Sequence, residues 1–328
     1  MARVSSRLCS RVFVLAAALA LAVAAVGAQE CVWEEARRAE AAQSGRPDAR
    51  GFATDDAPAG LATDDAGRIY VSHPDAGNVV VLDREGRRLS EKRGLERPLA
   101  VAADAAGRIY VGEQLPGRVG VFDPDWSFQF YLGQGAGEFL VPTGIAVDPE
   151  GAGWIYVADG GAHEVRVFGA DGTFLFAFGG LGSGPGQFDF PAAIHLVPGL
   201  DELPARLYVS DQNNDRIQIL DTQGSFVSCI GGDGGTRRFG RVTGLGRNRL
   251  GTLYAADSFQ GHVWVFDSAG ALLTTVGEFG STPGHLMTPL GLAIVGDTLL
   301  VASFNTGRVE AFLIPGPTRA TRTGKREP

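Results

Sequence analysis

Six copies of one strand pattern run along the chain, and this repeat constrains the fold more than any single residue does. Each copy has a short apolar strand that carries an anchor residue, and a further strand begins eight residues after the anchor. The anchors are Tyr70, Tyr110, Tyr156, Tyr208, Tyr254 and Leu300. They are separated by 40, 46, 52, 46 and 46 residues. A period in the forties predicts an array of similar supersecondary units.

A complete copy reads as four short strands. In the third copy, the segments PTGIAVD (142–148), IYV (155–157), VRVFG (165–169) and TFLFAFG (173–179) are rich in β-branched and aromatic residues. Gly, Asp and Pro separate them, which is typical of an antiparallel meander. A helical solenoid has a similar period but longer segments that are less often broken by Gly. We therefore predict an all-β, six-bladed β-propeller over residues 58–316, with one four-stranded sheet per blade.

The sixth copy lacks an obvious fourth strand. After its third strand the chain continues as PGPTRATRTGKREP, and we expect residues 317–328 to be a basic, disordered tail. Residues 44–57 are the only N-terminal donor of a closing strand, and they are rich in Gly, Pro and Asp, which are poor strand formers. We therefore expect either a loosely closed ring or a three-stranded last blade.

The N-terminus has the pattern of a secretory signal. Arg3, Arg7 and Arg11 precede an apolar run over residues 12–26, and small residues stand before a cleavage point after Ala28. This pattern predicts a signal peptide over residues 1–28, and hence a secreted, periplasmic or cell-envelope protein without a membrane span after cleavage. The alternative is an uncleaved membrane anchor, because the run approaches the length that spans a bilayer.

Cleavage would change the charge and leave two cysteines. Removing three Arg moves the net charge from −8 to −8 − 3 = −11, which argues against nucleic acid as a partner. Residues 29–57 are predicted to hold a short helix, at 32–43, and a linker. We expect a monomer with two unpaired thiols, Cys31 and Cys229, the latter buried in a strand.

The third copy also resembles a known repeat. The segment PTGIAVDPEGAGWIYVADGGAHEVRVFGADGTFLFAFGG (142–180) is similar to an NHL repeat, and the copies that open at Pro191 and Val242 match it well. The resemblance extends over about residues 58–316 and implies a six-bladed propeller. NHL propellers include RNA-binding and protein-binding domains, exported proteins of unknown role, and relatives of zinc-dependent peptidyl-amidoglycolate lyases. The resemblance therefore implies a fold and leaves the function open.

Blade topology places two kinds of connection on one face of the ring, which we call the loop face. The connections from second to third strand and from fourth strand to the next blade both lie there, and propeller ligands bind near such loops. The predicted ligand-binding residues of this face are His73, Glu113, His163, Arg238, His262 and Ser303.

One position recurs three residues after each anchor, and we call it the slot. It holds Asp159, Asp211 and Asp257, which we interpret as structural because Asp at a strand end accepts backbone N–H bonds. His73, Glu113 and Ser303 occupy the slots of the other copies and depart from this type. We therefore treat those three as the functional candidates.

His195 is the other departure from the repeat. It stands at the fifth position of an opening strand, where the remaining copies have Ala62, Ala102, Ala146, Gly246 and Ala293. It is either a ligand or base in the central channel or a buried core histidine. With His262 and His73 it is a candidate ligand for Zn or Ca, although their different offsets do not imply that they converge.

The expected function follows from these observations. We expect no catalytic residues and no cofactor, and an exported binding or scaffold module for a protein, peptide or other ligand on the loop face. The alternative is a metal-dependent lyase or hydrolase with a site at the central channel, as the resemblance to the amidoglycolate lyase relatives implies.

Overall fold

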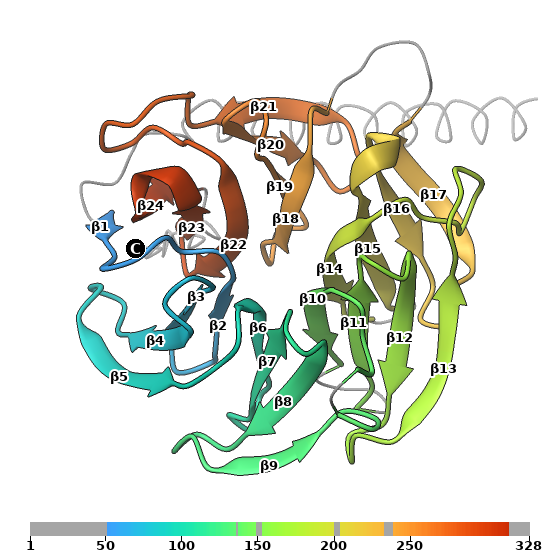
Figure 1. Ribbon diagram of the computed structural model, residues 1–328. Helices are drawn as coiled ribbons and strands as arrows, with labels where there is room; N and C mark the ends of the chain where they lie inside the picture. The colour runs from blue at the N-terminus through green and yellow to red at the C-terminus, as the bar shows by residue number, and fades with distance from the viewer. Residues whose placement is uncertain (1–50, 136, 149–152, 200–203, 233–238, 315–328) are drawn as a thin grey trace, which may run out of the picture.

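The computed structural model describes residues 51–135, 137–148, 153–199, 204–232 and 239–314. They form six four-stranded antiparallel sheets around a central channel, and the chain passes from blade to blade once around the ring (Figure 1). The predicted all-β, six-bladed propeller is therefore confirmed. Within these residues, no helix is long and apolar enough to cross a membrane. The predicted signal peptide, the 32–43 helix, Cys31, Arg238 and the basic tail lie outside the described residues.

The first three blades are regular meanders from the channel outward. Blade one contains β2 (Leu61–Thr63), β3 (Ile69–His73), β4 (Asn78–Leu82) and β5 (Arg88–Arg93). Blade two contains β6 (Pro98–Ala103), β7 (Ile109–Glu113), β8 (Arg118–Phe122) and β9 (Phe128–Tyr131). Blade three contains β10 (Pro142–Val147), β11 (Ile155–Asp159), β12 (Glu164–Phe168) and β13 (Phe174–Gly179).

The last three blades follow the same plan with small additions. Blade four contains β14 (Pro191–Val197), β15 (Arg206–Asp211), the 3₁₀ turn η1 (Gln212–Asn214), β16 (Arg216–Leu220) and β17 (Phe226–Gly231). Blade five contains β18 (Val242–Arg247), β19 (Leu253–Asp257), β20 (His262–Phe266) and β21 (Leu272–Val276). Blade six contains β22 (Pro289–Val295), β23 (Thr298–Ser303), the 3₁₀ turn η2 (Phe304–Thr306), β24 (Arg308–Leu313) and β1 (Phe52–Ala53).

The second strand of each blade is the centre of the core. Five such strands carry the anchor Tyr, and Tyr70, Tyr110, Tyr156 and Tyr254 are fully buried. Each strand is covered on both sides by neighbouring blades, which is why it reads as a continuous apolar run. The anchor pairs with the fifth residue of the opening strand, so that His195 lies opposite Tyr208.

The opening strands are rich in Gly and Ala because they converge on the channel. At the third position of β10, a Cβ added to Gly144 would lie 2.9 Å from the backbone nitrogen of Ile194 in the next blade. Gly60, Gly244 and Gly291 occupy the same position in three other blades, each against the neighbouring strand. A larger side chain at this position would therefore push adjacent blades apart.

The N-terminal segment closes the ring. Phe52 and Ala53 of β1 pair with Val309 and Arg308 of β24, so blade six has four strands and the two ends of the described chain lie side by side (Figure 1). Thr54 extends the contact through its backbone N–H, 2.9 Å from the Gly307 oxygen. The expected loose or three-stranded closure is therefore wrong. Two residues are enough because closure depends on backbone hydrogen bonds, which need no strand-forming side chains.

Cys229 corrects a second expectation. It lies in strand β17 as predicted, but its side chain is exposed. The fourth strand of a blade is the outermost one and most of β17 faces solvent, so an apolar-looking strand in this position does not bury its residues.

Candidate functional site

The slot Asp residues hold the loops that lead into their own blades. Asp159 accepts hydrogen bonds from the backbone N–H groups of Leu140, at 2.9 Å, and Val141, at 2.8 Å. Asp257 accepts from Gly240 at 2.6 Å and Arg241 at 3.0 Å. These contacts confirm the structural interpretation of these residues, since buried carboxylates here satisfy backbone donors that would otherwise lack partners.

The slot residues of blades two and six are not Asp, but they also bind the backbone of the loops that lead into their blades. The Glu113 carboxylate accepts from the Glu96 N–H at 2.7 Å and pairs with the Arg118 Nε at 2.7 Å. The Ser303 hydroxyl accepts from the Met287 N–H at 2.9 Å. Both side chains are buried, with 1% and 0% of their surface exposed. Ligand binding by these two residues stays a prediction, and their visible contacts are with the loops of their own blades.

His73 lies in a side pocket instead of the channel. Its Nδ1 is 3.0 Å from the Asn78 Oδ1, while its Nε2 is buried without a hydrogen-bond partner. Burial holds the pKa of His73 below its ordinary value, and the Asn78 contact partly opposes that shift. The pocket has a volume of about 280 Å³ and lies beside the closing segment, including Phe52 and Asp55.

His163 and His262 also contact the protein around them, although the Nε2 of His262 is buried without a hydrogen-bond partner. The Nδ1 of His163 accepts from the Phe190 N–H at 3.0 Å, and the His163 backbone is left-handed with φ of 58°. His262 packs edge-on against Trp264, with ring centres 4.6 Å apart, and burial lowers its pKa. These rings therefore position loops and strands.

A metal site would need several ligands that converge. Among the residues that the structure describes, no group of three His, Cys, Asp or Glu side chains is placed to hold a metal ion. The candidates His73, His195 and His262 come from blades one, four and five. The Zn or Ca alternative therefore has no ligand group in this part of the chain.

A ring of six aliphatic residues, which we call the collar, lies between an upper and a lower chamber of the central channel, and the collar side chains pack between neighbouring blades. Both chambers are lined by the collar, and every collar residue is buried, with 7–8% of its surface exposed. Each blade contributes one residue from the fourth position of its opening strand, namely Leu61, Val101, Ile145, Ile194, Leu245 and Leu292. The upper chamber opens on the loop face and the lower chamber on the opposite face.

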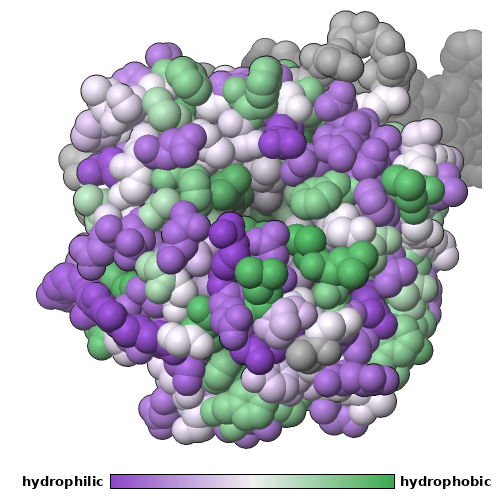
Figure 2. Space-filling model, viewed as in Figure 1, coloured by the Kyte–Doolittle hydropathy of each residue, from purple (hydrophilic) through white to green (hydrophobic). Residues whose placement is uncertain are grey.

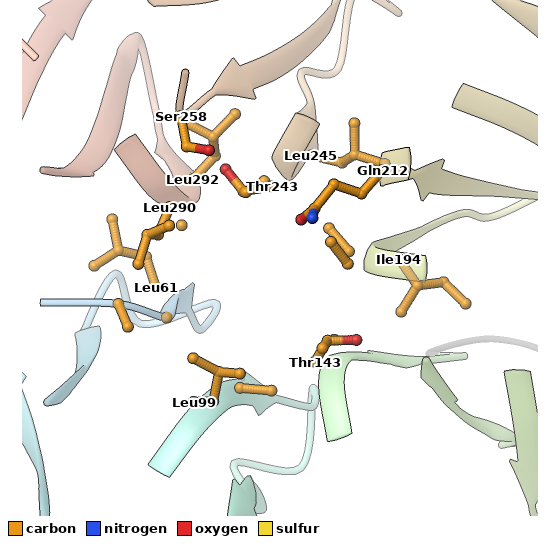
Figure 3. A pocket seen from close by; sticks show the side chains of 18 of the residues that line it. Leu61, Leu99, Thr143, Ile194, Gln212, Thr243, Leu245, Ser258, Leu290 and Leu292 are labelled. Atoms are coloured by element: carbon orange, nitrogen blue, oxygen red, sulfur yellow. The ribbon is translucent and has the colours of Figure 1, made fainter. Parts of the chain in front are cut away.

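The upper chamber has an apolar wall and a polar rim (Figure 3). Its volume is about 360 Å³, and Leu99 and Leu290 stand above the collar on its wall. The rim carries Gln114, Gln212 and Ser258. Arg241 is the only ionisable residue among the described residues that line this chamber.

The three rim residues follow the slot residues directly in the chain. Glu113, Asp211 and Asp257 end their strands as buried residues, and the next residue begins the connection that lines the chamber, with Gln212 in the 3₁₀ turn η1. The repeat points to the slot and not to this neighbouring position. The residue type there varies from copy to copy, so the alignment of the copies gives no signal for it.

Large apolar side chains are exposed on the loop face. The four most exposed of those described are Phe259, Leu140, Leu181 and Phe279, with exposed fractions of 78%, 66%, 66% and 64%. All four belong to connections of the loop face. Figure 2 shows a central hollow with apolar surface beside it. Exposed apolar side chains around a concave site are typical of an interaction surface.

Comparison with solved structures agrees with the fold. A streptogramin B lyase has a TM-score of 0.61 at 14% identity, over 83% of this chain and 98% of the lyase. The virginiamycin B lyase from Staphylococcus aureus has a TM-score of 0.59 at 14% identity, over 81% of this chain and 98% of that chain. A protein of unknown function from Bacteroides thetaiotaomicron has a TM-score of 0.62 at 16% identity, over 84% and 74%. No family model and no curated protein matches the sequence. These likenesses support the propeller fold alone, and the NHL resemblance stays a prediction.

Proposed function

We propose that the protein is an exported binding module that takes an apolar group of a peptide into the upper chamber of its channel. The observation that carries this proposal is the chamber itself, which is lined below by the collar residues and rimmed by Gln114, Gln212 and Ser258. Concave sites with apolar walls and a few convergent polar groups are the usual binding sites of proteins.

The chemistry of the chamber favours a peptide over a charged metabolite. The volume of about 360 Å³ lies at the lower end of the usual range for ligand sites, so it accepts one or two side chains. The rim amides offer both donors and acceptors, which suits peptide backbone groups. Phe259 and Leu140 extend the apolar contact beyond the mouth.

The proposed location rests on the sequence. The predicted signal peptide, at residues 1–28, supports export to the periplasm, the cell envelope or the medium. An NHL-type propeller in such a compartment fits a binding or scaffold role.

Catalysis has less support at this site. Two of the structural neighbours are lyases by name, at an identity of 14%. In the described part of the chain, the upper chamber is lined by no acid and no histidine. General acid–base chemistry there would depend on such groups, so we favour binding.

Display of a random peptide library on phage, with selection on the immobilised protein, tests the proposal. Leu290→Trp fills the upper chamber, and Leu272→Trp places the same side chain on the exposed outer strand β21 as a control. Selected peptides should bind Leu290→Trp at least about tenfold more weakly than the parent, since burial of one apolar side chain accounts for that change. Their affinity for the control should be unchanged. Failure to enrich any peptide, or equal binding to both variants, would contradict the proposal.

A further inference from the structure

The lower chamber contains the two polar departures from the repeat. His195 on β14 and Arg247 on β18 both line this chamber, which has a volume of about 330 Å³. The two strands are the opening strands of neighbouring blades. The residues that match Arg247 in the other blades are uncharged, namely Thr63, Ala103, Val147, Leu196 and Ile294. The only imidazole and the only guanidinium among the described lining residues are therefore side by side in the ring.

The guanidinium is held at the boundary between blades four and five. Its Nε donates to the Gly251 oxygen at 2.9 Å, and its central carbon lies 5.7 Å from the ring centre of Tyr208. Tyr208 is the direct cross-strand partner of His195. These contacts fix the cation next to the imidazole and leave its terminal nitrogens without a described protein partner.

The charge of Arg247 is not compensated as it is elsewhere on this face. In blade one, Asp64 binds both the Arg68 Nε, at 2.6 Å, and the Tyr70 hydroxyl, at 3.0 Å. Val197 takes the place of that Asp in blade four. Among the described residues, no carboxylate lies within ion-pair distance of Arg247, and no acid lines the lower chamber. A partly buried guanidinium favours a carboxylate, whose two oxygens match its two parallel N–H groups.

The imidazole beside it is neutral near pH 7. Burial and the charge of Arg247 lower the pKa of His195 to about 4. One ring nitrogen therefore carries a hydrogen and the other accepts, and neither has a hydrogen-bond partner in the described chain. The site then offers one positive charge and one neutral donor.

We propose that the lower chamber binds a small monocarboxylate with an aliphatic chain. The guanidinium of Arg247 takes the carboxylate, His195 donates to one of its oxygens, and the chain lies along Ala146 and Leu196 toward the collar. A single cation beside a neutral ring balances one negative charge, which favours a carboxylate over a phosphate dianion. This site is at the other end of the channel from the upper chamber and does not depend on the proposed function.

Calorimetric titration of the full chain with butyrate, hexanoate and phosphate, at constant ionic strength, tests the proposal. Hexanoate should bind on the order of tenfold more tightly than butyrate, because two further methylene groups contact the collar. Arg247→Met should weaken hexanoate binding at least about tenfold. His195→Asn should weaken hexanoate binding by about threefold to tenfold, because the N–H donor no longer lies where the imidazole placed it.

Arg249→Met is the matched control, because it removes the same charge from an exposed residue two positions away. It should leave the affinity unchanged. If Arg247→Met fails to fold, Arg247→Lys keeps the charge, loses the planar pair of donors, and should also weaken binding. The proposal is overturned if wild type binds no hexanoate up to about 50 mM, a range set by the weak affinity of such small ligands. It is also overturned if the Arg247 and Arg249 variants bind equally, or if phosphate binds and hexanoate does not.

Discussion

The two ends of the channel are built by the same six strands, yet each end places its one arginine among different groups. In the upper chamber Arg241 lies among uncharged rim residues and an apolar wall, whereas in the lower chamber Arg247 lies beside His195, and among the described residues no acid lines either chamber. The collar between them is common to all blades. This difference shows that the repeat determines the wall of the channel, and that single departures from it determine what each end can bind.

The largest effect is expected at the slot, one residue before the upper rim. Asp211→Ala should lower the free energy of unfolding by about 4 kcal/mol, because it leaves the buried Arg216 without its ion-pair partner. Chemical denaturation measures this change. Gln212→Ala, the adjacent rim substitution, is the control. A comparable decrease in its free energy of unfolding would contradict the division between slot and rim.

The collar should come next. Leu245→Ala should lower the free energy of unfolding by about 3 kcal/mol, since Leu245 is buried between blades four and five and its truncation leaves a cavity. The same truncation of Leu272, on the exposed outer strand, should cost less than about 0.5 kcal/mol. Urea denaturation of both variants measures this difference. A similar decrease in the free energy of unfolding for the two variants would contradict the burial of the collar.

The free energy of unfolding should depend on pH through His195 in the lower chamber. The pKa of His195 is about 4 in the folded protein and 6.5 ordinarily, so between these values the unfolded chain takes up a proton that the folded protein does not. The free energy of unfolding therefore has its full value above pH 6.5. It decreases by about 2 kcal/mol as the pH falls to 4, a value that allows for the partial exposure of this ring. His73 and His262 also have lowered pKa values, and the variant His195→Asn isolates the contribution of His195. An unchanged difference in stability between wild type and this variant at pH 7 and pH 4.5 would contradict the assignment.

The smallest effect on stability is expected at the upper rim. Gln212→Ala should lower the free energy of unfolding by only about 1 kcal/mol, because the side chain is buried but its amide makes one long hydrogen bond, 3.4 Å to the Asn213 oxygen. It should still weaken selected peptides by about fivefold, as the loss of one hydrogen bond does. Fluorescence anisotropy with a labelled peptide measures this, and unchanged affinity would place the peptide elsewhere.

Much of the fold was predictable because the repeat is strong. The period, the number of blades and the structural role of Asp159 all follow from the alignment of the six copies. Strand β1 was missed because two residues carry no pattern, and their pairing with β24 depends on backbone groups. The exposure of Cys229 was missed because burial depends on the place of a strand in its blade.

The candidate sites were less predictable for a physical reason. Gln114 and Gln212 line the upper chamber because they begin connections of the loop face, and the residue type at this position does not recur from copy to copy. Arg247 and His195 are far apart in sequence, and they lie on neighbouring strands only because each blade repeats the same register. Departure from the repeat was the criterion that also gave Glu113 and Ser303 as functional candidates. Their side chains bind loops of their own blades.

The central claim is that one channel contains two independent sites. The most direct test measures the affinity of a selected peptide and of hexanoate in both Leu290→Trp and Arg247→Met. The account predicts that Leu290→Trp weakens the peptide at least about tenfold and leaves hexanoate unchanged, and that Arg247→Met does the reverse. The same loss of both ligands in either variant would contradict it.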